Sequence, residues 1–280
     1  MQKSTSSSRL LASFAFTLLL IGIGTPAVQA HTSSYNANMS VGPKQYYLAL
    51  GNSLAFGYQP DLDFNHGYVD DLSADLRTRG NEQTANLACP EETSASFING
   101  GCPYALLRKF PYEGNQLSAA LLYLNEHQGQ VSPVTLDIGA NDVLPDLSRT
   151  NCVIDTEKFK SDLAALDTNL AQVILPRLHA ALMVNGRVTG DLLVENYYDP
   201  YQNQCPGTVP LMQEMNSHIA ADVRNLGVLV DVFAAFGGAA TPNQNLCVYT
   251  WICNKSFHDV HSTRVGYQII AKAFEQSAGY

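Results

Sequence analysis

The stretch LALGNSLAFGY, residues 48–58, joins an apolar run to a polar turn and then to a second apolar run. Leu48, Ala49 and Leu50 are typical of a buried strand, and Gly51-Asn52 supplies residues that favour a turn. Ser53 follows at once. A serine directly after a strand is either a turn residue or a nucleophile, and the partners available elsewhere in the chain decide between the two.

Short apolar runs like the first recur along the chain. Including that first run, they cover residues 46–50, 84–88, 134–138, 189–196 and 227–233. Segments with helical spacing lie between and after them, at 67–80, 115–129 and 156–183, around Met212, Met215 and Ile219, and around Tyr267, Ile270 and Phe274. This alternation predicts an α/β fold in one domain, with a mostly parallel sheet and helices on both faces.

The helical segment at 156–183 contains its own start and break signals. Asp155 or Thr156 can cap its first turn, and Pro176 should break or kink it because proline lacks the N–H that a helix interior uses.

The first thirty residues have the pattern of a secretory signal. Lys3 and Arg9 precede the apolar run Leu10–Ile23, and Val28-Gln29-Ala30 places small residues before an expected cleavage at His31. The run is shorter than the roughly 20 residues of a membrane span, although an uncleaved anchor is the alternative. We therefore expect a secreted, extracellular protein, with a signal peptide at 1–30 and one folded domain at 31–280.

Charge and cysteine content narrow the class of protein further. Removing residues 1–30 takes away Lys3 and Arg9 but no acid, so the formal charge changes from −9 to −11. Such an acidic chain is a poor candidate for binding nucleic acid or anionic membranes.

Six cysteines in an exported chain indicate disulfides, and we favour the pairs 89–102, 152–205 and 247–253 because each closes a loop between elements. Zinc is the alternative, but the chain has no CxxC pair.

Three polar segments should meet at one edge of the predicted sheet. Ser53 follows the first strand, Gly139-Ala140-Asn141-Asp142 follows the strand at 134–138, and His261 precedes the last helix. The carboxyl ends of parallel strands are where such sheets bind ligands. A serine nucleophile needs a base such as histidine, and the oxyanion that forms needs N–H or amide donors. Together these residues favour nucleophilic catalysis, whereas each one alone is ordinary turn or surface chemistry.

Four blocks between residues 46 and 275 resemble the SGNH or GDSL hydrolases, which are secreted esterases and lipases on a flavodoxin-like α/β/α sandwich. These blocks are GNSL at 51–54, NLACPEETSASF at 86–97, GAND at 139–142 and FHDVHSTRVGYQIIA at 257–271. The resemblance implies that Ser53 is the nucleophile and His261 the base. It also implies an oxyanion hole formed by the N–H of Ser53, the N–H of residue 91 and the side chain of Asn141.

The chain departs from the family pattern at three positions. Asn52 replaces the usual aspartate, and its side chain can still accept a hydrogen bond in the turn. Glu91 replaces the oxyanion-hole glycine, so its N–H can serve only if the backbone there accepts a side chain. His258 stands where the family usually has an aspartate. Asp259 is the nearest carboxylate, and the alternatives for orienting His261 are His258 itself or a backbone carbonyl.

The expected function is hydrolysis of carboxylic esters through an acyl-enzyme, with no cofactor and no metal, on a small-molecule, lipid or glycan ester. A catalytically weak relative that binds glycans or lipids is the alternative, as is an esterase that deacetylates polysaccharide. The tyrosines of NYYDPYQNQCPG (196–207) and Trp251 are candidates for the pocket wall, and plain loop packing is the other interpretation of those tyrosines.

Overall fold

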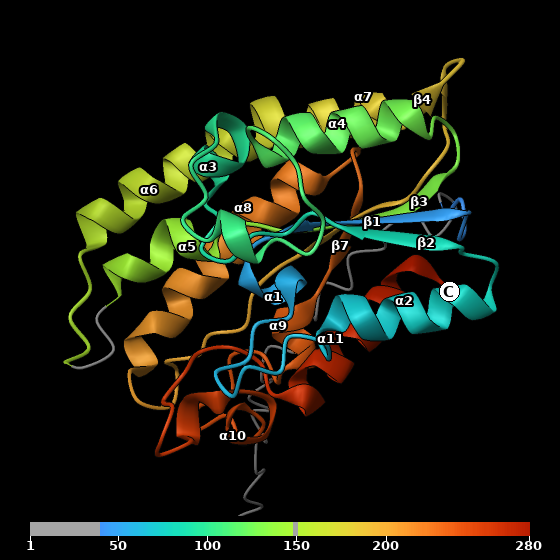
Figure 1. The fold of residues 1–280 in the computed structure, drawn as a ribbon. Coiled ribbons are helices and arrows are strands. Elements are labelled where there is room, and N and C mark those ends of the chain that lie inside the picture. Colours follow the sequence, from blue (N-terminus) through green and yellow to red (C-terminus); the bar gives the residue numbers. More distant parts are fainter. Residues whose placement is uncertain (1–39, 148–150) are drawn as a thin grey trace, which may run out of the picture. The chain divides into compact units, whose positions relative to one another are not determined.

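Five parallel strands form the central sheet of the computed structural model, which describes residues 40–147 and 151–280 (Figure 1). They are β1 (Tyr46–Gly51), β2 (Gln83–Asn86), β3 (Val131–Asp137), β6 (Leu192–Glu195) and β7 (Val228–Val230). Each overlaps one of the five predicted runs. Their order across the sheet is β2-β1-β3-β6-β7, and every neighbouring pair is parallel. The predicted signal segment at 1–30 lies outside the described residues.

Helices cover both faces of this sheet, which confirms the predicted three-layer α/β/α sandwich (Figure 1). One face carries α2 (Tyr68–Thr78) and α11 (Arg264–Ala278). The other carries α4 (Gln116–Glu126), α6 (Thr156–Asn169), α7 (Leu175–Ala181) and α8 (Val209–Val223). The shorter elements are α1 (Ser53–Phe56), α3 (Ser94–Asn99), α5 (Ala140–Val143), α9 (Val232–Ala235), α10 (Leu246–Tyr249) and a small hairpin of β4 (Met183–Val184) and β5 (Arg187–Val188).

The helix at 156–181 shows how the chain accommodates Pro176. Asp155 caps its start, because the Asp155 carboxylate accepts the Lys158 N–H at 3.1 Å. The turn Leu170–Ile174 is a π-helix, and α7 begins directly after it with Pro176 as its second residue. A proline is tolerated in a first helical turn, where its missing N–H leaves no bond unmade. The predicted break is therefore a local widening before the proline, and the chain stays helical on both sides.

The order of the strands determines where in the sheet the candidate site lies. The chain goes from β1 to β2 on one side of β1, and its next strand, β3, lies on the other side. The direction of winding thus reverses between β1 and β3, and segments leaving the carboxyl ends of these two strands diverge and open a crevice. Ser53 follows β1 and Asn141 follows β3, so both lie at this crevice.

Three disulfides tie down the loops around the sheet. They join Cys89 to Cys102, Cys152 to Cys205 and Cys247 to Cys253, which are the pairs favoured from the sequence. Among the residues that the structure describes, no helix is both long and apolar enough to cross a membrane.

Candidate active site

The turn after β1 exposes Ser53 by using a glycine and an asparagine. Gly51 has a φ of 134°, and a Cβ there would lie 1.5 Å from Asp137 Oδ1, so this position accepts only glycine. Asn52 caps α1 by accepting the Leu54 N–H at 3.0 Å. Ser53 is therefore the first residue of a short helix, with its hydroxyl at the edge of the sheet.

His261 lies against Ser53 although the two are 208 positions apart in the sequence. The Ser53 hydroxyl donates to His261 Nε2 at 2.7 Å. The loop that carries His261 is fixed on both sides: Trp251 N–H donates to the His261 carbonyl, and the Tyr198 hydroxyl donates to the Val260 carbonyl. This fixed backbone orients the imidazole toward the crevice between β1 and β3.

Asp259 is the carboxylate that contacts the imidazole. Its Oδ1 lies 2.6 Å from His261 Nδ1 and also accepts the His261 backbone N–H at 2.8 Å. A carboxylate bonded to Nδ1 fixes the tautomer whose Nε2 can accept the serine proton. His258 instead sits at a left-handed turn with a φ of 47°, and its N–H donates to the Asn254 carbonyl. Of the three candidates from the sequence, the structure therefore places Asp259 in contact with His261.

Asn141 and two backbone N–H groups face the crevice as possible anion donors. Asn141 Nδ2 donates one proton to the Glu92 carbonyl at 3.0 Å, which fixes the amide and leaves its second proton available. Within the described residues, neither the Ser53 N–H nor the Glu91 N–H has an acceptor. Asn141, Ser53 and Glu91 all line the same cavity. The arrangement therefore offers up to three donors to one oxyanion.

The backbone at Glu91 has a conformation that favours glycine, although a glutamate occupies it. Its φ is 62°, in the left-handed region that glycine occupies most easily, so the side chain is held at a steric cost of about 1–2 kcal/mol. The Glu91 side chain is exposed, whereas Glu92 beside it is buried. The glutamate thus keeps the N–H geometry of a glycine and adds a carboxylate at the rim of the cavity.

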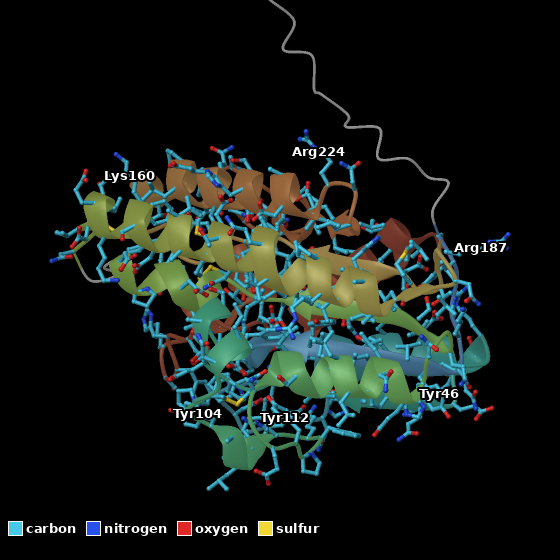
Figure 2. The ribbon with its side chains drawn as sticks, turned by 90° about the horizontal axis from the view of Figure 1, so that it is seen from above. Tyr46, Tyr104, Tyr112, Lys160, Arg187 and Arg224 are labelled. Atoms are coloured by element: carbon cyan, nitrogen blue, oxygen red, sulfur yellow. A yellow bond between two sulfur atoms is a disulfide. The ribbon has the colours of Figure 1, made fainter. Side chains whose placement is uncertain are left out.

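The cavity at the crevice measures about 330 Å³ and is largely apolar. Most of its wall consists of Leu54, Tyr58, Pro90, Tyr104, Leu107, Ala140, Leu144, Tyr197, Tyr198, Pro200, Met212 and Val260. Tyr197 and Tyr198 come from the loop at 196–207 and line the cavity as predicted, whereas Trp251 is not part of the wall. Figure 2 places Tyr104 at the end of the molecule away from Tyr46, the residue that begins β1.

Tyr58 covers the imidazole from the side. Its ring centroid lies 4.6 Å from that of His261. Burial raises the pKa of Tyr58, and the nearby carboxylates of Asp259 and Glu91 raise it further. The phenol therefore stays neutral beside His261.

Two polar networks hold the segments that carry the donors. Asp142, next to Asn141, accepts the backbone N–H and the hydroxyl of Ser94 at the start of α3. Gln116 of α4 accepts the Gly51 N–H at 2.6 Å and donates to both the Gly51 carbonyl and Glu92 Oε2 at 3.0 Å. The second network links the turn before Ser53 to the segment that follows Glu91.

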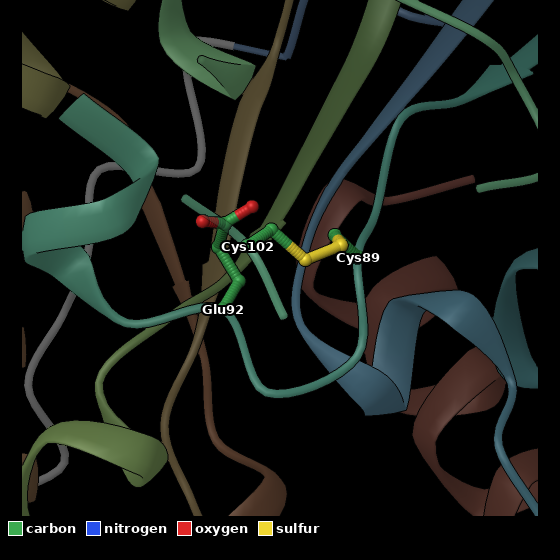
Figure 3. A group of neighbouring side chains, drawn as sticks. All are labelled: Cys89, Glu92 and Cys102. Carbon is green, nitrogen blue, oxygen red and sulfur yellow. A yellow bond between two sulfur atoms is a disulfide. The ribbon is translucent and has the colours of Figure 1, made fainter. Parts of the chain in front are cut away.

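Among the described residues, one group brings potential metal ligands together: Cys89, Glu92 and Cys102 (Figure 3). The two sulfurs are bonded to each other, so neither is a thiolate that could bind zinc. Glu92 Oε2 already accepts from Gln116. These donors do not fit a zinc site, and we assign them to holding the loop beside the cavity.

Sequence reasoning missed the residues beneath the nucleophile. Asp137 accepts two N–H groups of the Ser53 turn, Glu195 lies in the adjacent strand, and Gln116 bonds to Gly51. A signal was present for the two acids: each is the next-to-last residue of a predicted strand run, in VTLDI and in TGDLLVEN, where burying a carboxyl costs free energy.

The comparisons with known proteins agree with this geometry. Residues 49–269 match the model of the GDSL-like lipase/acylhydrolase family. The chain belongs to this family. Its members are ester hydrolases, and the matched residues include Ser53, Asn141 and His261. A comparison with curated proteins gave no match.

Several solved structures share the fold of this GDSL-like chain at low sequence identity. Axe2, an acetylxylan esterase from Geobacillus stearothermophilus, has a TM-score of 0.56 and 16% identity over 86% of this chain and 97% of its own. The lipase Lip_vut3 from a goat rumen metagenome has a TM-score of 0.57 and 16% identity, over 85% of this chain and 98% of its own. TesA has a TM-score of 0.51 and 18% identity, over 83% of this chain and 97% of its own. At these identities the likeness shows the fold alone.

Proposed function

We propose that the protein is a secreted serine esterase or lipase that hydrolyses carboxylic esters through an acyl-enzyme. The observation that carries the proposal is the 2.7 Å contact between Ser53 Oγ and His261 Nε2, with Asp259 on the other ring nitrogen. Family membership supports ester hydrolysis in general. The expected signal at 1–30 and the three disulfides support export.

The first half of the reaction forms the acyl-enzyme. Ser53 Oγ attacks the ester carbonyl carbon while its proton passes to His261 Nε2. The carbonyl oxygen becomes an oxyanion that accepts hydrogen bonds from the Ser53 N–H, the Glu91 N–H and Asn141 Nδ2. The bond to the alcohol oxygen then breaks, and His261 gives its proton to that oxygen. Asp259 stabilises the imidazolium between these two steps.

The second half releases the acid. His261 accepts a proton from water as the water oxygen attacks the acyl carbon, and a second oxyanion forms in the same hole. Its collapse breaks the bond to Ser53 Oγ, and His261 returns the proton to the serine. The cycle consumes one ester and one water and releases one alcohol and one carboxylic acid.

The wall of the cavity favours an uncharged, apolar acyl group. Its described lining contains aliphatic and tyrosine side chains but no lysine or arginine, and its carboxylates belong to Glu91 and Asp259. Acidic substrates would meet these carboxylates without a balancing cation. An acetyl ester on a polysaccharide is the second candidate, because tyrosines such as Tyr58, Tyr104 and Tyr198 also suit stacking against sugars.

The test compares residues 31–280 of the wild type with the Ser53→Ala variant. We expect turnover of p-nitrophenyl acetate, butyrate and octanoate by the wild type, and a loss of about 10³-fold or more in the variant. Acetylated xylan run beside the p-nitrophenyl series separates the polysaccharide substrate from the lipid-like ones. Equal background rates from both proteins on all four substrates contradict the proposed function and favour a binding protein.

A further inference from the structure

Two carboxyl groups are buried beneath the nucleophile, and the proposed reaction uses neither. Asp137 is the last residue of β3 and Glu195 the last of β6. These strands pair in parallel with Leu136 beside Val194, so the two acids lie side by side at the carboxyl end of the sheet. Both side chains are fully shielded from solvent.

Asp137 contacts the turn that presents Ser53 at three residues. Its Oδ1 accepts the Asn52 N–H at 3.1 Å, which the Asp137 backbone carbonyl also accepts at 3.2 Å. Its Oδ2 accepts the Ala55 N–H at 3.2 Å. The same carboxylate packs against the Cα of Gly51, where no Cβ could fit. Asp137 therefore holds the backbone on both sides of Ser53. The Leu54 N–H donates to the Asn52 side chain. Among the N–H groups of residues 52–55, the one of Ser53 is therefore left to donate to an oxyanion.

Glu195 differs from Asp137 in having no donor. Neither of its oxygens has a hydrogen-bond partner in the described structure. The titratable groups on which the charges of this pair act are the phenols of Tyr47 (β1), Tyr68 (α2), Tyr197, Tyr198 and Tyr267 (α11). Burial raises the pKa of each of these phenols, so all five are neutral. No cation is among the described groups that act on either carboxyl.

Two uncompensated charges cannot share such a site, so one of the acids must be neutral. Burial raises the pKa of both carboxyls; the N–H bonds from Ala55 and Asn52 oppose the rise at Asp137, and the charge of Asp137 adds to the rise at Glu195. The donors thus favour the charge on Asp137 and leave the proton on Glu195.

We propose that Asp137 is a positioning residue for the nucleophile. Its carboxylate holds the Asn52 and Ala55 N–H groups so that the Ser53 hydroxyl faces His261 and the Ser53 N–H faces the oxyanion, while a protonated Glu195 lies beside it. This role rests on the proposed esterase function for its effect on turnover, but its effect on the turn is independent of any substrate.

The main variant is Asp137→Asn, which keeps the shape of the side chain. An amide can accept only one of the two N–H groups, and its NH₂ opposes the other. We expect kcat on p-nitrophenyl butyrate to fall about 10- to 100-fold with KM within about twofold of the wild type, because a misplaced nucleophile affects the chemical step. Amide hydrogen exchange should accelerate at Ala55, whose N–H is held by the Asp137 side chain, while the Asn52 N–H keeps its bond to the Asp137 backbone carbonyl.

Asp191→Asn is the matched control. Asp191 is also buried, also belongs to the segment of β6, and also accepts two backbone N–H groups, those of Val41 and Gly42. It lies at the opposite, amino end of that strand, away from Ser53. We expect Asp191→Asn to lower Tm while kcat stays near that of the wild type. If the two variants lose kcat only in proportion to their loss of Tm, or if Asp137→Asn keeps the wild-type kcat, the positioning role is wrong.

Infrared spectroscopy tests the charge assignment without any activity. The wild type at pH 7 should show the carbonyl band of a buried protonated carboxyl that is missing in Glu195→Gln and present in Asp137→Asn. A band that disappears in Asp137→Asn alone overturns the assignment. Should the wild type fail to hydrolyse any ester, the esterase proposal fails, and exchange at Ala55 still decides whether the Asp137 side chain holds the turn.

Discussion

Glu91 combines a glycine-like backbone with a charged side chain at the mouth of the cavity. Its φ is 62°, its N–H belongs to the oxyanion hole that we propose, and its side chain is exposed at the rim. A negative charge near a forming oxyanion raises the energy of the transition state, and solvent and salt reduce this effect.

Glu91→Gln should therefore raise kcat. Glutamine keeps the length of the side chain and removes only the charge, so we expect an increase of about two- to fivefold at low ionic strength. The gain should shrink as salt is added, because the carboxylate is exposed. Steady-state kinetics at two salt concentrations measure it. A lower kcat, or a gain that salt leaves unchanged, contradicts this account of Glu91.

The orientation of His261 can be tested with two neighbouring residues. Asp259→Asn should lower kcat by about 10²- to 10⁴-fold with little change in KM, because the amide no longer fixes the tautomer whose Nε2 accepts the serine proton. His258→Asn is the control, since asparagine tolerates the left-handed backbone at that position and the carboxylate on His261 Nδ1 is that of Asp259. A similar loss of kcat in both variants argues for a disturbed loop and against a role for Asp259 itself.

At the scale of elements, α4 is tied to the nucleophile turn through one buried side chain. Gln116, the first residue of α4, bonds to both backbone groups of Gly51 and to Glu92. Gln116→Leu should lower the free energy of unfolding by about 2–4 kcal/mol, because it leaves buried polar groups unpaired. Urea unfolding measures the loss. Leu122→Gln on the exposed side of the same helix, where Leu122 is 58% exposed, should change little. Equal losses in both variants contradict the network.

The elements were predictable from the sequence where periodicity or composition decides them. The run at 134–138 and the stripe of Tyr267, Ile270 and Phe274 both predicted elements that the structure contains. The pairing of Asp137 with Glu195 was not predictable in this way, since it depends on which strands become neighbours and in what register. Cavity walls such as Tyr58, Tyr104 and Leu107 come from loops or a short helical turn, whose sequence carries no period.

For the whole molecule, the three disulfides should contribute unequally to stability. The bridges close 53, 13 and 6 residues for Cys152–Cys205, Cys89–Cys102 and Cys247–Cys253. Loop-closure entropy of the unfolded chain then predicts losses of about 4, 3 and 2 kcal/mol in the corresponding double serine variants. Denaturant unfolding of the three variants gives the order. If removing Cys247–Cys253 costs most, native contacts rather than chain entropy determine these contributions.

The buried acid pair makes the free energy of unfolding depend on pH. Because the pKa of Glu195 is raised well above its ordinary 4.5, the folded chain keeps a proton that the unfolded chain releases above that pH. Stability of the wild type therefore falls by about 1.4 kcal/mol per pH unit from this group, starting near pH 4.5 and continuing until the folded carboxyl ionises.

Glu195→Gln should remove this loss of stability at rising pH. The variant should become more stable than the wild type as pH rises from 5 to 8. Below pH 4 the unfolding free energies of the two proteins should converge, because Glu195 is then protonated in both the folded and the unfolded wild type. Unfolding free energies at several pH values measure the difference. A difference that stays constant with pH indicates that Glu195 is ionised in the folded protein.

The distance of 208 positions between Ser53 and His261 also determines when the enzyme can first work. A ribosome adds these residues over about 10–40 s at ordinary rates, and throughout that time the nascent polypeptide has its attacking oxygen but not its proton acceptor. A nascent chain or a fragment that ends before His261 lacks one of the two. Under the proposed function, ester hydrolysis therefore begins only after the chain through His261 has been made and has folded.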